Sequence, residues 1–358
     1  MKWDAKSERM MISDKDMEVL AQCGALAREI FYYGCKVDGI PPVWSVLSYM
    51  LLQEKPSSTK QAWRYYRRYL RIAKNRDKWY LDRSIPKVSG GKRAIAIPTG
   101  ILALYQRQIS STVLEHLPVS PCAYAYRKGI NIRQCAEPHV NQELLFHLDI
   151  EDFFGSITEG MVYQRLLEDT GYPKSLCRFF ARLCCYRGRL PQGAPTSPIL
   201  SNIIFRPCDE ALSELAEQFG LRYTRYSDDL FFSGGKEVDR VEFLGRVERI
   251  LFYHGFRMNK EKTRVLGRHN CQKVLGLTVN ERVQVNRKYK RKLLQEMYYL
   301  ERFGEGCNGA AEEEHYYLYM QKLLGRLVYA LSIEPDNAAL REAHLKLQMR
   351  LFHFSWDE

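Results

Sequence analysis

Two adjacent carboxylates stand among apolar, β-prone residues in segment 225–232, which reads Arg-Tyr-Ser-Asp-Asp-Leu-Phe-Phe. The pattern predicts a tight hairpin with Asp228 and Asp229 at its tip. Two like charges repel, and their burial is costly unless cations neutralise them. A divalent metal ion would supply that neutralisation. For an isolated Asp-Asp pair, a solvated surface turn is the alternative interpretation.

A third carboxylate ends an apolar stretch earlier in the chain. Segment 144–154 reads Leu-Leu-Phe-His-Leu-Asp-Ile-Glu-Asp-Phe-Phe, so a predicted strand ends at Asp149. Acids that converge from separate strands can hold two Mg²⁺ ions, which activate an attacking hydroxyl and stabilise a leaving oxygen in phosphoryl transfer. Asp149, Asp228 and Asp229 could form such a set. Two unrelated acidic turns would show the same spacing.

A loop rich in proline and glycine lies between these acids. It reads Leu-Pro-Gln-Gly-Ala-Pro-Thr-Ser-Pro over residues 190–198, and the run after it, with Ser201 and Asn202, has a helical pattern. The loop either simply opens a core helix or forms a preorganised shelf for a substrate. Its residues alone leave both interpretations open.

The three segments, in this order and spacing, resemble the palm of the reverse transcriptases over residues 85–335. Segment 226–229 is similar to the Tyr-x-Asp-Asp catalytic hairpin of that family. Asp149 with the following Phe153-Phe154 resembles the first catalytic motif, and 190–193 resembles the loop that contacts the incoming nucleotide.

Within that family the chain most resembles the bacterial retron type, through segments 192–198 and 225–230. Two retron hallmarks are altered. The family's Asn-Ala-x-x-His is Cys-Ala-Glu-Pro-His at 135–139, and its Val-Thr-Gly is Val-Leu-Gly at 274–276. The alterations leave the polymerase prediction intact and leave the kind of RNA partner open.

The resemblance implies a catalytic set. Asp149, Asp228 and Asp229 would bind two Mg²⁺ ions, with Mn²⁺ as a substitute and the backbone carbonyl of Ile150 as a further ligand. Lys262 would be the general acid for the pyrophosphate leaving group.

The resemblance also implies a set of nucleotide contacts. Phe154 would be the steric gate that rejects ribonucleotides by a clash at the 2′ position. Gln192 would contact the incoming sugar or base, and Arg93 or Lys87 would bind the triphosphate. Core packing for Phe154, and solvated surface charges for Arg93 and Lys87, are the alternatives.

The charge of the chain favours a polyanionic partner, since the formal net charge is +12 and the isoelectric point is about 9.1. Segment 60–71 interleaves aromatic residues with arginines at helical spacing, which suits phosphate contact and base stacking. A solvated helix face is the alternative. The predicted RNA or template contacts are Arg64, Arg67, Arg68, Arg71, Arg127, Lys128, His139, Gly276, Arg287, Lys288, Lys290 and Arg291. We otherwise expect His139 and His147 to pack or form hydrogen bonds rather than bind metal.

The predicted fold is α+β, a right-hand polymerase with an antiparallel palm sheet. The predicted parts are a helical N-terminal extension (1–80), fingers (81–135), palm (136–275) and a helical thumb (276–358) broken near 304–309. The ten cysteines show no Cys-x-x-Cys spacing and are expected to be reduced. No apolar run has membrane-spanning length, so we expect a cytoplasmic protein without a membrane partner.

The leading functional hypothesis, taken from the resemblance, is an RNA-directed DNA polymerase of retron type. Its partners would be a structured noncoding RNA, an RNA–DNA hybrid, deoxynucleoside triphosphates (dNTPs) and a separate effector protein in anti-phage defence. One alternative is a non-retron defence reverse transcriptase with another template or none. A catalytically silent RNA-binding scaffold is the alternative from a different class, and the complete acid set argues against it.

Overall fold

The computed structural model describes residues 2–4, 9–11, 72, 75–86, 90–172, 174–304 and 310–354. At its centre is an antiparallel four-stranded sheet with the order β6-β7-β5-β8. The strands are β5 (Leu144–Asp149), β6 (Arg222–Tyr226), β7 (Asp229–Gly234) and β8 (Arg264–Gly267). The predicted α+β class with an antiparallel palm sheet is confirmed.

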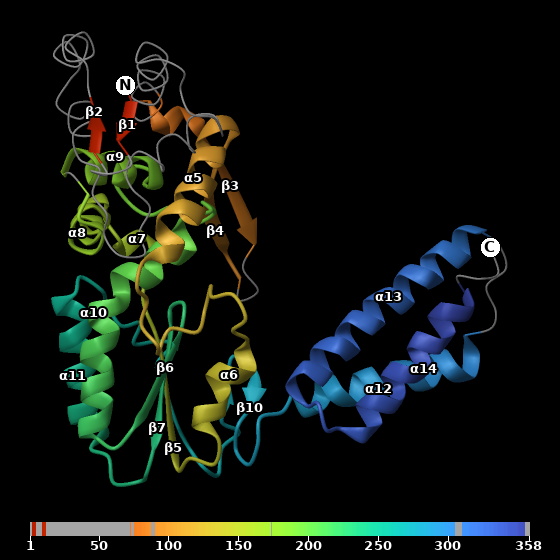
Figure 1. Ribbon diagram of the computed structural model, residues 1–358. Helices are drawn as coiled ribbons and strands as arrows, with labels where there is room; N and C mark the ends of the chain where they lie inside the picture. The colour runs from red at the N-terminus through yellow and green to blue at the C-terminus, as the bar shows by residue number, and fades with distance from the viewer. Residues whose placement is uncertain are drawn as a thin grey trace.

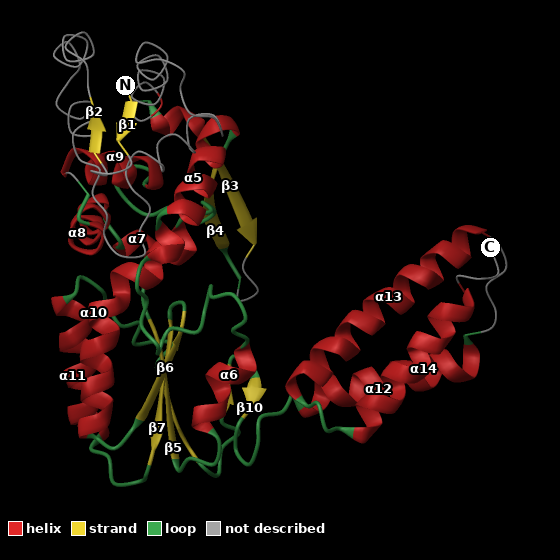
Figure 2. Cartoon of the chain, viewed as in Figure 1, coloured by secondary structure: helices red, strands yellow, loops and turns green. Residues whose placement is uncertain are grey.

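The sheet is covered on both faces, as Figures 1 and 2 show. Alternate residues of β5 therefore enter different cores: Phe146 and Leu148 pack in one hydrophobic cluster, and Leu145 packs in the other with Phe231. Burial on both sides explains why β5 has an almost continuous apolar sequence. The covering helices are α10 (Ser197–Gln218) and α11 (Arg240–Tyr253) on one face and α6 (Ile132–Ala136) with η3 (Glu137–His139) on the other.

The predicted fingers contain a long hairpin beside a helix. The expected strand at 93–97 lies in β4, and the expected helix at 101–115 is divided between α5 and η2. Thr170 and Gly171 end a further helix, α8, with Gly171 in the left-handed region that favours glycine. The elements of the fingers range are β3 (Tyr80–Pro86), β4 (Lys92–Pro98), α5 (Gly100–Thr112) and η2 (Leu114–His116). The helices between β5 and the loop before α10 are α7 (Phe153–Ser156), α8 (Glu159–Thr170) and α9 (Lys174–Cys184).

The last part of the chain forms a three-helix unit that projects from the sheet beyond β10 (Figure 1). Leu293, Leu323 and Leu347, one from each helix, share its core. One helix ends at Phe303 and the next begins at Ala310, and most of the break expected at 304–309 lies outside the described residues. The elements are β9 (Lys273–Val274), β10 (Leu277–Thr278), α12 (Arg287–Phe303), α13 (Ala310–Ile333) and α14 (Ala338–Phe354).

The described part of residues 1–80 differs from the helical expectation at one place. Two short antiparallel strands pair there, β1 (Lys2–Asp4) with β2 (Arg9–Met11), and η1 (Arg76–Trp79) leads into β3. The helices predicted at 14–30 and 44–53, and nearly all of the one at 58–75, lie outside the described residues. Among the helices that the structure does describe, none has the length and apolar character needed to cross a membrane.

Candidate active site

The register of the sheet brings the predicted acids together. Asp149 at the end of β5 pairs directly with Asp229 at the start of β7. One residue further, the Ile150 amide donates to the Asp228 carbonyl at 3.0 Å. The hairpin predicted from Tyr-Ser-Asp-Asp is therefore present, and Ser227 in its turn has a left-handed φ of 60°. The end of β5 and the turn between β6 and β7 therefore lie side by side at one end of the sheet.

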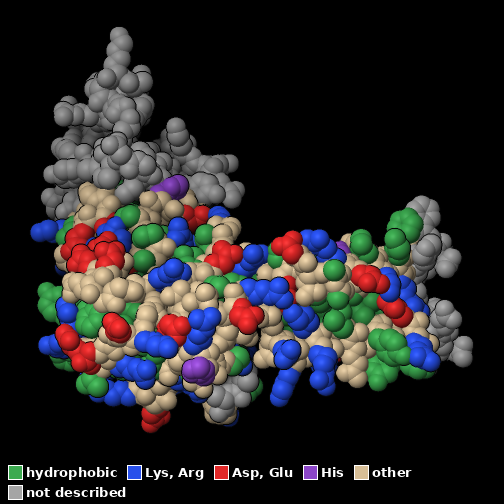
Figure 3. Space-filling view, turned by 90° about the horizontal axis from the view of Figure 1, so that it is seen from below, with side chains coloured by type: hydrophobic (Ala, Val, Ile, Leu, Met, Phe, Trp, Pro, Cys, Tyr) green, Lys and Arg blue, Asp and Glu red, His purple; other side chains and the backbone are tan. Residues whose placement is uncertain are grey.

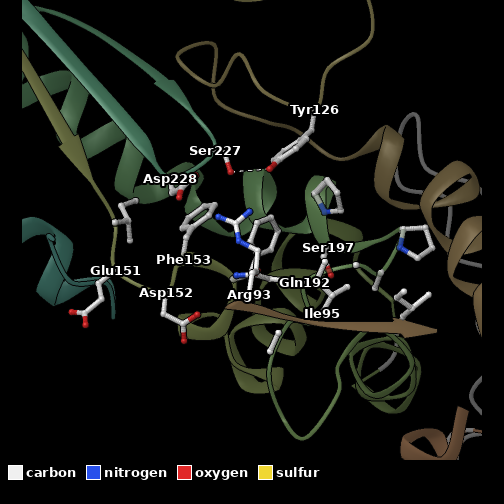
Figure 4. A pocket seen from close by; sticks show the side chains of 18 of the residues that line it. Arg93, Ile95, Tyr126, Glu151, Asp152, Phe153, Gln192, Ser197, Ser227 and Asp228 are labelled. Atoms are coloured by element: carbon white, nitrogen blue, oxygen red, sulfur yellow. Dashed lines mark hydrogen bonds between the residues drawn. The ribbon is translucent and has the colours of Figure 1, made fainter. Parts of the chain in front are cut away.

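A cavity of about 950 Å³ opens at that edge. Its wall includes Asp149 and Asp228, together with Arg93 from β4, Gln192 from the loop and Lys262. Figure 4 shows the Arg93 guanidinium reaching into this pocket between Asp228 and Gln192. The pocket therefore brings two of the three predicted catalytic acids together with Arg93 and Lys262, a combination that suits a metal-bound triphosphate.

The charges around Asp149 and Asp228 favour a cation between these two carboxylates. Burial, followed by the charges of Asp229 and Asp149, raises the pKa of Asp228 above its ordinary value. The Lys262 ammonium lies 2.8 Å from Asp149 Oδ2, and this hydrogen bond raises the pKa of Lys262. Carboxylate oxygens are the ligands that Mg²⁺ prefers, so Asp149 and Asp228 fit a divalent metal.

The third acid is turned away from the cavity. His147 Nε2 lies 2.7 Å from Asp229 Oδ1, and the imidazole stacks on Phe231 with ring centroids 4.7 Å apart. The hydrogen-bonding role expected for His147 is confirmed, but its partner, Asp229, could not be predicted from the sequence. In this geometry the described residues hold no cluster of three or more His, Cys, Asp or Glu side chains suited to a metal.

The loop after Leu190 contacts the fingers strand closely. The Gln192 carbonyl accepts from the Ala96 amide at 2.9 Å. Gly193 has φ +113°, and a Cβ there would lie 2.5 Å from the Ile95 side chain. Only glycine fits this approach. The loop thus lines the cavity and leads into α10, and its role as a shelf for a substrate stays a prediction.

The two phenylalanines after Asp149 have different surroundings. Phe153 is buried against Phe205 and Phe256. Phe154 lies at the pocket, half-buried, with its ring 6.4 Å from that of Tyr126. Phe154 therefore lines the cavity, and its role as a steric gate stays a prediction. Phe153 also borders the cavity, but it is a core residue. Lys87, the other predicted triphosphate contact, lies outside the described residues.

Tyr126 is a pocket residue that the sequence did not single out. Its hydroxyl shares a hydrogen bond with Ser227 Oγ at 2.8 Å, visible in Figure 4, and its φ is 61°. Burial raises the pKa of Tyr126, so the phenol is neutral. Residues 124–130 read Tyr-Ala-Tyr-Arg-Lys-Gly-Ile, so the sequence shows two aromatic residues there, and the contact of Tyr126 with the hairpin arises from tertiary folding.

The predicted nucleic-acid contacts fall into different environments. Lys128 is 91% exposed and pairs with Glu115 at 2.9 Å, whereas Arg127 donates to the backbone carbonyl of Ala123 at 3.0 Å. Gly276, at φ +81°, forms the turn between β9 and β10. Arg287, Lys288 and Arg291 are exposed on α12, while Arg64, Arg67, Arg68 and Arg71 lie outside the described residues.

Two of these predictions need correction. His139 is fully buried, with its ring nitrogens 2.7 Å from Ser233 Oγ and 2.7 Å from Thr224 Oγ1, so it cannot contact RNA. Burial, helped by a nearby positive charge, lowers the pKa of His139 to about 3. The Lys290 ammonium lies 2.7 Å from Glu334, so it is engaged inside the thumb rather than presented to phosphate.

The altered Asn-Ala-x-x-His motif lies in the same buried region. Cys135 Sγ is 3.4 Å from Thr224 Oγ1, the hydroxyl that also contacts His139. Both side chains are buried. The change from Asn to Cys therefore alters packing behind the sheet and not a surface that could touch RNA.

Comparison with known proteins agrees with this site. The family model described as "Reverse transcriptase (RNA-dependent DNA polymerase)" matches residues 85–279, which include all three predicted acids. The chain belongs to the reverse transcriptase family. Within the family it is of the retron type. It is 34% identical over 287 residues to the Retron Mx65 reverse transcriptase of Myxococcus xanthus, and the aligned part covers 74% of this chain and 64% of the relative.

Two further relatives give the same result. The Retron Ec86 reverse transcriptase of Escherichia coli is 30% identical over 246 residues, covering 68% of this chain and 73% of the relative. The Retron Mx162 reverse transcriptase of Myxococcus xanthus is 35% identical over 228 residues, covering 56% and 47%. This reverse transcriptase thus spans less than two thirds of the length of two of these three relatives.

Proposed function

We propose that this protein is an RNA-directed DNA polymerase of retron type, which copies part of a cognate structured RNA into DNA that remains joined to RNA. The observation that carries the proposal is the pocket in which Asp149 and Asp228 meet Lys262, Arg93 and Gln192. This combination suits nucleotidyl transfer, because acids, cations and a shelf for the nucleotide face one cavity.

Each pocket residue has a task in that reaction. Arg93 binds the triphosphate with its planar fork, and Gln192 contacts the nucleotide. Phe154 excludes a 2′-hydroxyl by its bulk. Lys262, beside Asp149, is placed to give a proton to the departing pyrophosphate.

Asp149 and Asp228, with the Ile150 carbonyl, would hold two Mg²⁺ or Mn²⁺ ions, and Asp229 would join them by releasing His147. When bound, the metal would lower the pKa of the attacking hydroxyl and stabilise the leaving oxygen. The raised pKa of Asp228, caused first by burial and then by the charges of Asp229 and Asp149, supports this assignment, since a bound cation would stabilise the ionised carboxylate.

The template–primer would lie against the thumb. Figure 3 shows Lys and Arg side chains gathered near the junction of the sheet and the three-helix unit. Exposed Arg287, Lys288 and Arg291 begin α12 in that region. We assign residues 81–135 to fingers, 136–275 to palm and 276–358 to thumb, with 1–80 as an N-terminal extension. A structured noncoding RNA, an RNA–DNA hybrid, dNTPs and a separate defence effector are the proposed partners.

The test is purification of the protein from its native locus with its bound nucleic acid, beside an Asp228→Ala, Asp229→Ala control. The extract is treated separately with RNase and DNase. A discrete DNA joined to RNA, absent from the control, is the expected result. DNA of irregular length without a fixed RNA would instead indicate a non-retron defence reverse transcriptase, and RNA alone in both samples would indicate a scaffold.

A second test concerns the basic surface. RNA affinity should fall steeply with salt, because neutralised phosphates release counterions. Affinity measured by filter binding over a salt series checks this. A flat response would exclude a large basic groove.

A further inference from the structure

A buried arginine lies directly behind the catalytic turn. Arg225 on β6 is fully buried and forms a bidentate pair with Asp209 of α10. Nε donates to Oδ1 at 2.8 Å and Nη2 donates to Oδ2 at 2.7 Å. A buried ion pair is often no more stabilising than apolar side chains of similar volume. Stability alone is therefore a weak reason for a guanidinium at this place.

The remaining guanidinium nitrogen reaches the turn itself. Arg225 Nη1 donates to the Ser227 carbonyl at 3.1 Å, and the Ile150 amide donates to the next carbonyl, that of Asp228, at 3.0 Å. Ser227 has φ 60°, a conformation that non-glycine residues hold only when their surroundings enforce it. Two hydrogen bonds thus fix the backbone on either side of the Asp228 Cα, and with it the direction of the carboxylate.

The same nitrogen connects the turn to the pocket wall. Arg225 Nη1 also donates to Asn202 Oδ1 at 3.1 Å, and Asn202 Nδ2 donates to the Ala125 carbonyl at 2.8 Å. The backbone carbonyl of Arg225 accepts from the Tyr124 amide at 2.9 Å. Ala125 precedes Tyr126, which lines the pocket and bonds the Ser227 hydroxyl. One side chain therefore links α10, the hairpin and the segment that faces the substrate.

We propose that Arg225, held by Asp209 and Asn202, is a positioning residue for nucleotidyl transfer, an inference that rests on the polymerase function proposed above. It acts through the Ser227 carbonyl, which sets where the Asp228 carboxylate stands. Loss of the fork should therefore slow the chemical step and weaken metal binding more than it weakens nucleotide binding.

The test variant is Arg225→Lys, which keeps the charge but loses the fork. In the full chain, kcat for dNTP incorporation on a primed RNA template should fall by roughly 10- to 100-fold, because displacement by about 1 Å can cost that much. KM for the nucleotide should change by less than about threefold. Mn²⁺ affinity, measured by electron paramagnetic resonance of the free ion, should also fall.

Arg206→Lys is the matched control, because it disturbs another pair of the same helix away from the hairpin. Arg206 Nη2 lies 2.7 Å from Asp169 Oδ1 and joins α10 to α8. The thermal midpoint of the Arg206→Lys variant should fall, while its kcat should stay within about twofold of the wild type. If Arg225→Lys lowers kcat no more than Arg206→Lys at equal folded fraction, Arg225 is merely structural and the proposal is wrong.

Two outcomes would prevent a direct comparison of kcat, and each is decided by a further measurement. If Arg225→Lys does not fold, Asn202→Ala keeps the Arg225–Asp209 ion pair and removes the side-chain bridge from Arg225 Nη1 to the Ala125 carbonyl. Its kcat should fall by roughly threefold or more, and an unchanged kcat would overturn the proposal. If the wild type incorporates no nucleotide, the polymerase function fails by itself. Mn²⁺ affinity then decides: it must be weaker in Arg225→Lys than in Arg206→Lys, and equal affinities would refute the positioning role.

Discussion

Two lysine–carboxylate pairs, one at the pocket and one in the thumb, have nearly the same length and opposite surroundings. Lys262 lies 2.8 Å from Asp149, and the lysine side chain is 63% exposed. Lys290 lies 2.7 Å from Glu334, with exposures of only 19% and 6%. Water and substrate can compete for the first pair but are kept from the second. The first is therefore an exchangeable contact, and the second is part of the architecture.

The partners of Glu334 support this distinction. Besides Lys290, its carboxylate accepts from the Val285 amide at 3.0 Å and from Asn337 Nδ2 at 2.9 Å. These bonds join the residues just before α12 to the end of α13. At the pocket, in contrast, Asp149 faces an open cavity of about 950 Å³. We call the Lys262–Asp149 contact the open pair, because both residues line the cavity, and the largely buried Lys290–Glu334 contact the closed pair.

The largest effect should come from removing an acid at the open pair's site. Asp228→Asn should lower nucleotide incorporation on the order of 10³-fold or more, because the metal would lose a charged ligand. Its thermal midpoint should stay equal or rise, since repulsion among the acids is relieved. Steady-state kinetics and a thermal melt check both parts. Retained activity would remove Asp228 from the catalytic set.

The closed pair should respond in the opposite way. Glu334→Gln leaves Lys290 buried without a countercharge and should cost about 3 kcal/mol of unfolding free energy. Urea denaturation measures this loss. An unchanged midpoint would show that the thumb does not depend on the pair.

The pH dependence of that loss sharpens the comparison. Burial by itself would raise the pKa of Glu334, but the hydrogen bonds from Lys290 and Asn337 hold it below its ordinary value of 4.5. A depressed pKa contributes stability above the unfolded value, and the contribution is lost as pH falls through the folded pKa. The free-energy difference between the wild type and Glu334→Gln should therefore be constant near neutral pH and shrink below pH 4.5.

Lys262→Ala should separate function from stability at the open pair. Solvent screens this contact, so the unfolding free energy should change by less than about 1 kcal/mol. Incorporation should fall by about 100-fold, as expected for loss of a general acid. Single-turnover kinetics and urea denaturation check the two effects. A large loss of stability with normal catalysis would show that Lys262, like Lys290, serves the stability of the fold and not catalysis.

The smallest effect should come from a fully solvated pair. Lys128→Ala removes a lysine that is 91% exposed and bonded to Glu115. Stability should not change measurably, but if Lys128 contacts a phosphate, the salt slope of RNA binding should fall by about one. Glu115→Ala, which removes only the partner, is the control and should leave the slope unchanged or slightly steeper. Equal slopes for all three proteins would exclude Lys128 from the RNA surface.

The sequence by itself determined the chemistry and the local elements of this protein. An apolar stretch ending in an acid predicted β5, and two adjacent acids among apolar residues predicted the hairpin with Asp228 and Asp229. Proline and glycine predicted the loop before α10. The residues at 93–97 also predicted the strand in β4, and the glycines at 304–309 predicted a break in the helical thumb. These features could be predicted because strand, turn and helix preferences depend on neighbours along the chain.

Only the tertiary structure decided which of these residues meet and which are free. It placed His139 and Cys135 behind the sheet, engaged Lys290 with Glu334, turned Asp229 to His147 and set Arg225 behind the catalytic turn. A sequence gives the charge and hydrogen-bonding capacity of each side chain. Burial and partners come from segments far apart in the chain, and they decide whether a histidine or lysine serves a ligand or the core.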